Sequence, residues 1–142
     1  MSAKNNNISL YFHIHLISDS TGETLVAIMK ASAAQFRNAT ALEHLHTLVR
    51  SEENLQSTLE EIKNKPGVVL YTLMNPDRRK TLEKFCVRNK IPAIPVLDQP
   101  ISMLGRYLGS RMIREVGAQR NLDAEYYNRI EALDFAMAHD DG

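Results

Sequence analysis

Residues 68–74 read Val-Val-Leu-Tyr-Thr-Leu-Met, and this stretch decides the fold of the chain. A near-continuous apolar run is typical of a strand in a parallel sheet, where helices cover both faces. Pro66-Gly67 precedes the run and Asn75-Pro76 follows it, and these residue types end one element and begin the next. We therefore predict the central strand of an α/β fold here.

The alternation of strand and helix continues on both sides of this run. Further strands are predicted at residues 10–17, 42–49 and 91–97, and helices at residues 25–37, after Ser51, after Asn75 and from Asp98. Such alternation implies right-handed crossovers and an open three-layer parallel sheet of about four strands, with helices on both faces. Pro92 and Pro95 cannot donate ladder hydrogen bonds, so the last strand should lie at an edge. The strand order 2-1-3-4 meets this requirement.

Each predicted helix has one apolar stripe at helical spacing that should face the sheet. The stripe residues are Leu25, Ile28, Met29, Ser32 and Phe36 in the first helix, Leu55, Leu59 and Ile62 in the second, Leu82, Phe85 and Cys86 in the third, and Ile101, Leu104 and Leu108 in the fourth. We expect these residues to pack against the sheet.

The chain has the length of about one domain. Residues 1–8 are predicted to be a flexible tail and residues 9–120 an α/β domain that ends in a loop from Gly109. Residues 121–142 are predicted to form a C-terminal helix. Its apolar face would consist of Tyr126, Ile130, Leu133 and Met137.

The composition argues against several classes of function. Lys plus Arg and Asp plus Glu are both 17, so no overall basic field favours nucleic acid or a membrane surface. The single cysteine, Cys86, can form neither an internal disulfide nor a metal cage. No apolar run approaches the roughly 20 residues of a membrane span, and Met1 to Asn7 lacks the apolar core of a signal peptide. We expect a cytoplasmic protein that binds neither nucleic acid nor membrane.

In a sheet of order 2-1-3-4, ligands favour the crevice beyond the carboxyl ends of strands one and three, where the winding reverses. Residues 18–24, Ser-Asp-Ser-Thr-Gly-Glu-Thr, lie there and lead into a helix. Hydroxyls and backbone N–H groups at a helix N-terminus can hold a phosphate or a carboxylate. The candidates for binding a phosphate or a partner in this loop are Ser18, Ser20, Thr21, Gly22 and Thr24.

A purely structural interpretation of this loop competes with the functional one. Ser20-Thr-Gly-Glu23 matches a capping box, in which Ser20 bonds the Glu23 amide and Glu23 reaches back. Capping does not explain Asp19, an acid at a strand end that could orient a hydroxyl or a metal-bound water, although such residues often only terminate strands. Asp19 is therefore a weak candidate for a catalytic residue.

Residues 74–80, Met-Asn-Pro-Asp-Arg-Arg-Lys, form the second loop of the predicted crevice. Arg78 and Arg79 are candidates because an arginine can bind an anion through two hydrogen bonds. The alternative is that these charged side chains only lie in solvent at the start of a helix.

Four histidines should lie close together on neighbouring strands, because His13 and His15 share one strand face and His44 and His46 another. We expect no metal there, since metal-binding histidines need second-shell partners and usually a carboxylate or cysteine ligand. Neither G-x-x-x-x-G-K-[ST] nor G-x-G-x-x-G occurs in the chain, so a self-sufficient nucleotide hydrolase or dehydrogenase is not expected.

The chain resembles the pyruvate, phosphate dikinase regulatory proteins at two distant places. His13-Ile-His-Leu-Ile-Ser-Asp-Ser-Thr-Gly-Glu-Thr24 is similar to the opening strand and turn of that family, and residues 122–142 are similar to the segment before its phosphate-binding half. The related regulators of phosphoenolpyruvate synthase share the final helix type but differ in the first turn. The turn therefore favours the dikinase branch.

The resemblance implies a bifunctional regulator whose partner is pyruvate, phosphate dikinase. It would phosphorylate a dikinase threonine in an ADP-dependent reaction and remove that group in a phosphate-dependent reaction that releases pyrophosphate. ADP and phosphate would be substrates, and the full-length protein would be a homodimer. The general base and the residues that position the acceptor are not assigned.

Family members are longer, and their P-loop follows the Asp140-Asp-Gly142 segment. We therefore expect an amino-terminal part that leads towards a P-loop half, is inactive alone, and binds neither ADP nor phosphate tightly. The alternative is a stand-alone doubly wound module that binds an anion or recruits a partner without catalysis.

Overall fold

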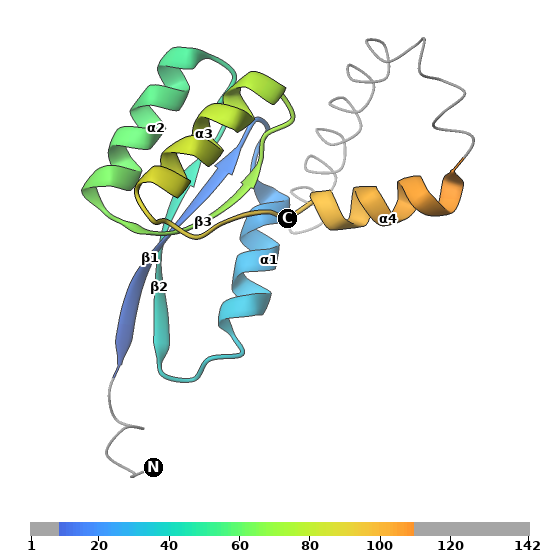
Figure 1. Cartoon of the computed structure of the whole chain (residues 1–142). Coiled ribbons are helices and arrows are strands. Elements are labelled where there is room, and N and C mark those ends of the chain that lie inside the picture. The colour runs from blue at the N-terminus through green and yellow to red at the C-terminus, as the bar shows by residue number, and fades with distance from the viewer. Residues whose placement is uncertain (1–8, 110–142) are drawn as a thin grey trace.

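The computed structural model describes residues 9–109 and has the α/β architecture that the sequence predicts (Figure 1). Four parallel strands lie in the order β2-β1-β3-β4, which confirms the predicted order 2-1-3-4. The elements along the chain are β1 (Leu10–Ser18), α1 (Glu23–Ala33), β2 (Ala39–His46), α2 (Glu52–Asn64), β3 (Gly67–Thr72), α3 (Pro76–Arg88), β4 (Ala93–Pro95) and α4 (Asp98–Leu108).

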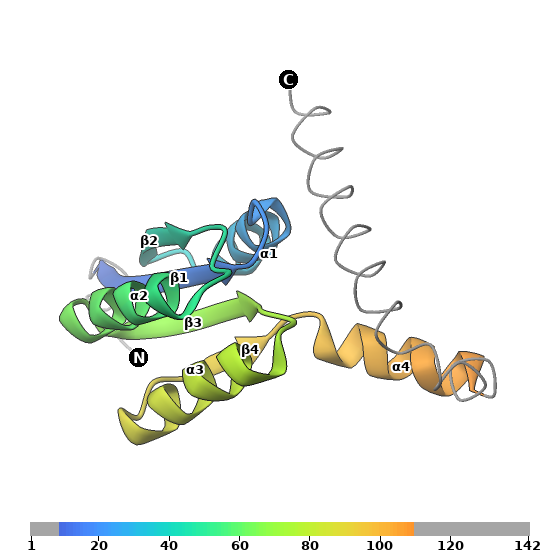
Figure 2. The same cartoon turned by 90° about the horizontal axis from the view of Figure 1, so that it is seen from above.

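Helices cover both faces of the sheet, as predicted, with α1 on one face and α2 and α3 on the other (Figures 1 and 2). Neighbouring residues of β1 point to opposite faces: Leu16 packs with Leu25 and Met29 of α1. Ile17 belongs to the larger core under α2 and α3. The buried members of that core are Ile17, Val49, Leu55, Leu59, Ile62, Val69, Tyr71, Leu73, Leu82, Cys86 and Ile91.

The predicted starts of α2 and α3 are confirmed in atomic detail. Ser51 is the N-cap of α2, and its hydroxyl accepts a hydrogen bond from the amide of Asn54 at 3.1 Å. Asn75 caps α3, and its side-chain oxygen accepts from the amides of Asp77 and Arg78 at 3.0 Å each. Pro76 occupies the first turn, where its missing N–H costs nothing.

The prediction for the end of the first helix is wrong. Helix α1 ends at Ala33 because the amides of Gln35 and Phe36 bond the carbonyls of Ser32 and Ala33, tightening the turn to three-residue spacing. Phe36, predicted to face the core, is 67% exposed, and Ser32 is exposed as well. Leu25 and Met29 alone are buried along this helix.

Several strand boundaries also differ from prediction. β2 begins at Ala39 and ends at His46, three residues before the predicted end, and Leu48 then adopts a positive φ of 53°. β4 is reduced to Ala93–Pro95, and it lies at the sheet edge as its prolines require.

The predicted inward stripe of the fourth helix is wrong. α4 buries none of its residues and extends away from the sheet (Figures 1 and 2). Leu104 is 52% exposed and Leu108 46%, while Ile101 is half-buried. Apolar spacing shows that a helix has an apolar face, but it does not show which surface covers that face.

The other predictions about the ends of the chain lie outside the described residues. These are the tail at residues 1–8, the loop from Gly109 to residue 120 and the helix at residues 121–142. Within residues 9–109, no helix combines the length and apolarity that crossing a membrane requires.

Candidate functional site

The candidate site lies at the carboxyl edge of the sheet, where β1 and β3 end side by side at Ser18 and Thr72. Both residues are buried. The Thr72 hydroxyl donates to Ser18 Oγ at 3.3 Å, and the Ser20 amide donates to the same oxygen at 2.9 Å. Ser18, a predicted binding residue, therefore shapes the turn that follows β1.

Asp19 joins the loops that follow three strands. Its carboxylate oxygen Oδ2 accepts a hydrogen bond from the amide of Met74, after β3, at 3.0 Å. Its backbone carbonyl accepts from Nε of Arg50, after β2, at 2.6 Å. Asp19 is only 5% exposed, so its position is set by the protein and not by solvent. This placement brings a carboxylate to the point where the winding of the sheet reverses.

Arg50 is the residue of this edge that the sequence interpretation missed. A signal was available: Arg50 directly follows the strand predicted at residues 42–49, and the carboxyl ends of parallel strands meet at one edge. Two backbone bonds hold this segment in place, from the Leu48 amide to the Ser20 carbonyl and from the Val49 amide to the Ser18 carbonyl, both at 3.0 Å.

The capping-box interpretation of Ser20 and Glu23 is wrong. The N-cap of α1 is Gly22, in a left-handed conformation with φ 82°, and no side chain caps the helix there. Ser20 is buried, and its hydroxyl has no hydrogen-bond partner among residues 9–109. The positive φ of Gly22 favours glycine, whereas a Cβ there would crowd only the mobile end of the Leu45 side chain, Cδ1 at 2.8 Å.

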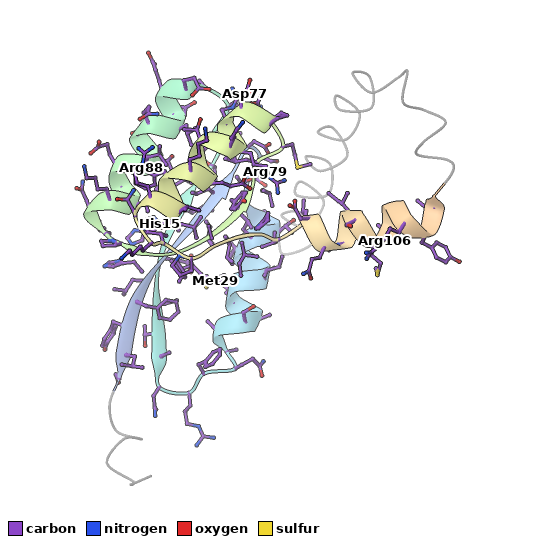
Figure 3. The ribbon with its side chains drawn as sticks, viewed as in Figure 1. His15, Met29, Asp77, Arg79, Arg88 and Arg106 are labelled. Atoms are coloured by element: carbon purple, nitrogen blue, oxygen red, sulfur yellow. The ribbon has the colours of Figure 1, made fainter. Side chains whose placement is uncertain are left out.

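The second predicted loop brings its two arginines to the start of α3, where Figure 3 shows Arg79. The Arg79 guanidinium forms ion pairs with Glu83, at 3.1 Å, and with Asp98. These carboxylates raise the pKa of Arg79, with the Asp98 hydrogen bond as the largest cause. Arg78 makes no ion pair within the described part of the chain. Anion binding stays a prediction for both residues. Among the described residues, carboxylates offset the charge of Arg79 but not that of Arg78.

Arg79 also closes a small cluster over the end of β3. Its guanidinium lies 5.6 Å from the centre of the Tyr71 ring, and the Tyr71 hydroxyl donates a hydrogen bond to Glu83. Burial, together with the negative charge of Glu83, raises the pKa of Tyr71. The cluster links β3, α3 and α4, and it accounts for Arg79 without a ligand.

The predicted proximity of the four histidines is confirmed. Nδ1 of His13 lies 2.8 Å from Nε2 of His44, and Nδ1 of His15 lies 3.1 Å from Nε2 of His46. Within residues 9–109, no set of three or more histidine, cysteine or acidic side chains has a geometry that could hold a metal ion.

The carboxyl edge thus combines several groups that phosphate chemistry uses. A helix N-terminus attracts anions, a buried hydroxyl can donate to a phosphate oxygen, and an arginine supplies positive charge. These groups are α1, Ser20 and Arg50, and the Asp19 carboxylate next to them can accept a proton. Thr21 is exposed at the same turn, whereas Gly22 is buried.

Comparison with known proteins gives one consistent result. A family model described as kinase/pyrophosphorylase matches residues 14–142. A protein of Maricaulis maris (strain MCS10) is 51% identical over 142 residues, which are 100% of this chain and 51% of the relative. A protein of Caulobacter vibrioides is 52% identical over 132 residues, 93% of this chain and 42% of the relative. Both carry the name "putative pyruvate, phosphate dikinase regulatory protein". The chain spans about half the length of the curated relatives that it matches.

Proposed function

Because this chain belongs to the kinase/pyrophosphorylase family, we propose that it is the amino-terminal part of a phosphotransfer enzyme that regulates pyruvate, phosphate dikinase. In one direction a dikinase threonine hydroxyl attacks the terminal phosphorus of ADP, forming phosphothreonine and releasing AMP. In the other, a phosphate oxygen attacks the phosphothreonine phosphorus and the bond from that phosphorus to the threonine oxygen breaks, so the products are pyrophosphate and the regenerated threonine hydroxyl.

One observation carries the proposal: the carboxyl edge holds Asp19, the buried Ser20 hydroxyl and the N-terminus of α1 in one turn. Phosphoryl transfer needs positioned donors and positive charge more than covalent chemistry from the protein. The Ser20 hydroxyl has no partner among residues 9–109, and a buried hydroxyl is costly for a fold when it is unpaired, so a ligand oxygen that accepts from Ser20 would be favoured.

Asp19 is the group best placed to take the proton of the threonine hydroxyl. A general base must be held in position, and the Met74 amide holds its carboxylate. Arg50 contributes positive charge beside the same turn, where charge develops on the transferring group. These roles extend the sequence-based candidates Ser18, Ser20, Thr21, Gly22 and Thr24 by one cation.

The nucleotide is assigned to another part of the full-length enzyme, because this chain contains no P-loop motif. The relatives are about twice as long as the chain, which leaves room for that part. We propose that residues 1–142 alone bind phosphate weakly and do not turn over.

The function is tested by incubating dikinase and ADP labelled in its terminal phosphoryl group with either the full-length enzyme or residues 1–142. We expect labelled phosphothreonine with the full-length enzyme only, and release of pyrophosphate when unlabelled phosphate is then added. No labelling by the full-length enzyme would refute the function. Labelling by residues 1–142 would refute the proposal that another part of the enzyme is needed.

The half-site is tested separately by titrating residues 1–142 with inorganic phosphate while recording amide chemical shifts. We expect saturable shifts at the amides of residues 20–24, since these lie at the start of α1. Ser20→Ala should weaken binding about fivefold to twentyfold, as loss of one hydrogen bond implies. Ser57→Ala, on the exposed surface of α2, is the matched control and should bind as the unchanged chain does. Shifts confined to other residues would leave the turn a structural feature only.

A further inference from the structure

Four histidines form a continuous ladder on the face of β1 and β2 that α2 covers. The rings of His13 and His44 have centres 5.0 Å apart, those of His44 and His15 4.7 Å, and those of His15 and His46 5.3 Å. We call these four residues the histidine ladder. His15, labelled in Figure 3, is fully buried and contacts two of the other three rings.

The surroundings of His15 determine which of its nitrogens carries a hydrogen. Nε2 of His15 lies 2.8 Å from the backbone carbonyl of Lys65, and a carbonyl can only accept. Nε2 of His15 must therefore carry a hydrogen, and in the neutral ring Nδ1 is left as an acceptor. It follows that Nε2 of His46, 3.1 Å away, donates to Nδ1 of His15.

Protonation of His15 breaks this pattern. A proton added to His15 goes to Nδ1, where it faces the N–H of His46, so His46 must move its hydrogen to its other nitrogen or the two rings must separate. A second proton in the same pair leaves two donors facing each other. The stacked rings would also place like charges about 5 Å apart in a poorly solvated site.

The groups around the ladder do little to offset such a charge. Glu61 of α2 favours protonation of His15, His44 and His46, and Lys65, the residue after α2, opposes protonation of His44. The β3 residues in register with His13 and His15 are Gly67 and Val69, which carry no charge. Burial is the largest influence, and it lowers the pKa of His15 and His44 and that of His46 to about 4.

The direction of the pH effect follows from linkage. An unfolded histidine titrates at about 6.5, so between that pH and the lower folded pKa the unfolded chain binds more protons than the folded chain. The contribution of the ladder to stability is therefore complete above about pH 6.5 and is lost as the pH falls towards about 4.

The ladder is directly connected to the candidate site. β2 is an edge strand of the described sheet, and β1 is its partner in that sheet. Two and three residues after His46, the amides of Leu48 and Val49 hold the carbonyls of Ser20 and Ser18. Separation of β1 and β2 at the ladder would therefore release these two bonds and the Arg50 contact to Asp19.

We infer that the histidine ladder is a proton-operated switch, which holds β2 and the Asp19–Arg50 edge in place when it is neutral and releases them when it is protonated. The switch would lower phosphotransfer activity on acidification, and this consequence rests on the proposed function. The switch itself can be tested without any activity measurement, so the two proposals can fail separately.

The test uses residues 1–142 and two nuclear magnetic resonance measurements between about pH 8 and pH 4. At the alkaline end, side-chain nitrogen spectra should show that Nε2 of His15 carries a hydrogen and that Nδ1 carries none. Amide exchange, corrected for its intrinsic pH dependence, should show protection at Leu48 and Val49 falling about tenfold per pH unit below pH 6.5. Protection at Val69, whose amide bonds Pro92 on the β4 side of the sheet, away from β2, should fall later.

The matched variants are the pair His44→Gln with His46→Gln, and His139→Gln. Glutamine keeps an N–H donor for His15 but takes no proton, and only His13 and His15 of the ladder still titrate, so the acid-dependent change at Leu48 and Val49 should be smaller in the double variant. His139→Gln removes a histidine that is not part of the ladder and should keep that change. Equal loss of protection at Val69 and Val49, or an Nδ1–H form of His15 at pH 8, would overturn the switch even if the double variant did not fold.

Discussion

Gly67→Ala is expected to lower the free energy of unfolding by about 3 kcal/mol or more. Among the described glycines, this is the position where an added methyl group should be most damaging. A Cβ at Gly67 would lie 1.9 Å from the backbone oxygen of His13 and 2.9 Å from its Cβ. The clash is with backbone, so no side-chain rotation relieves it. β1 and β3 must move apart at the centre of the sheet, where His13 and Gly67 are in register.

The measurement is urea unfolding of residues 1–142 followed by circular dichroism. Gly105→Ala is the matched control, because a Cβ there meets nothing within 4 Å. Alanine is favoured over glycine in a helix by about 1 kcal/mol, so this variant should show no loss of stability. If Gly67→Ala lowered the free energy of unfolding by less than the change that Gly105→Ala causes in it, the close approach of β1 and β3 would be refuted.

Asp19→Asn is expected to lower the turnover number of the full-length enzyme about 100-fold or more, the range found when a general base is removed. Asparagine keeps a side-chain oxygen that can accept from the Met74 amide, so the geometry of the edge should survive. What is lost is the ability to take the proton of the attacking hydroxyl. The Michaelis constant for ADP should change little, because the nucleotide is assigned to another part of the enzyme.

Asp77→Asn is the control for this measurement. Asp77 is an exposed acid in the first turn of α3, close to the same edge of the sheet (Figure 3). The Asp77→Asn variant loses the same charge as Asp19→Asn and should keep near-normal turnover. Initial rates of threonine phosphorylation, with thermal unfolding of each variant measured alongside, separate catalysis from stability. Equal losses in both variants would show that the effect is general electrostatics and would reject Asp19 as the base.

Much of the fold could be predicted because its signals are local. The apolar run at residues 68–74 indicated a strand covered on both faces, and prolines in the last strand required an edge position. Together these implied the order that the sheet adopts. Ser51 and Asn75 could be recognised as caps because a cap bonds amides within three residues of itself.

The candidate site was predictable in place but not in detail. Strand order located the edge where Ser18 and Asp19 lie, and that location is correct. The capping-box motif offered a second interpretation of Ser20 as a helix cap, whereas the left-handed Gly22 begins α1 and leaves the Ser20 hydroxyl unsatisfied among the described residues. Arg50 entered the site through a contact that crosses from one loop to another, 31 residues apart in sequence.

The sequence by itself determined the alternation of strands and helices, the parallel sheet and the family, because periodicity, caps and motifs are all properties of short segments. Only the tertiary structure decided that Gly67 must lack a side chain, since the obstacle is the backbone of His13, 54 residues earlier. It also decided that α4 leaves its apolar face uncovered by the described residues, and that four histidines share hydrogen bonds. Each depends on which distant surfaces meet, and a pattern along one segment carries no information about the surface opposite to it.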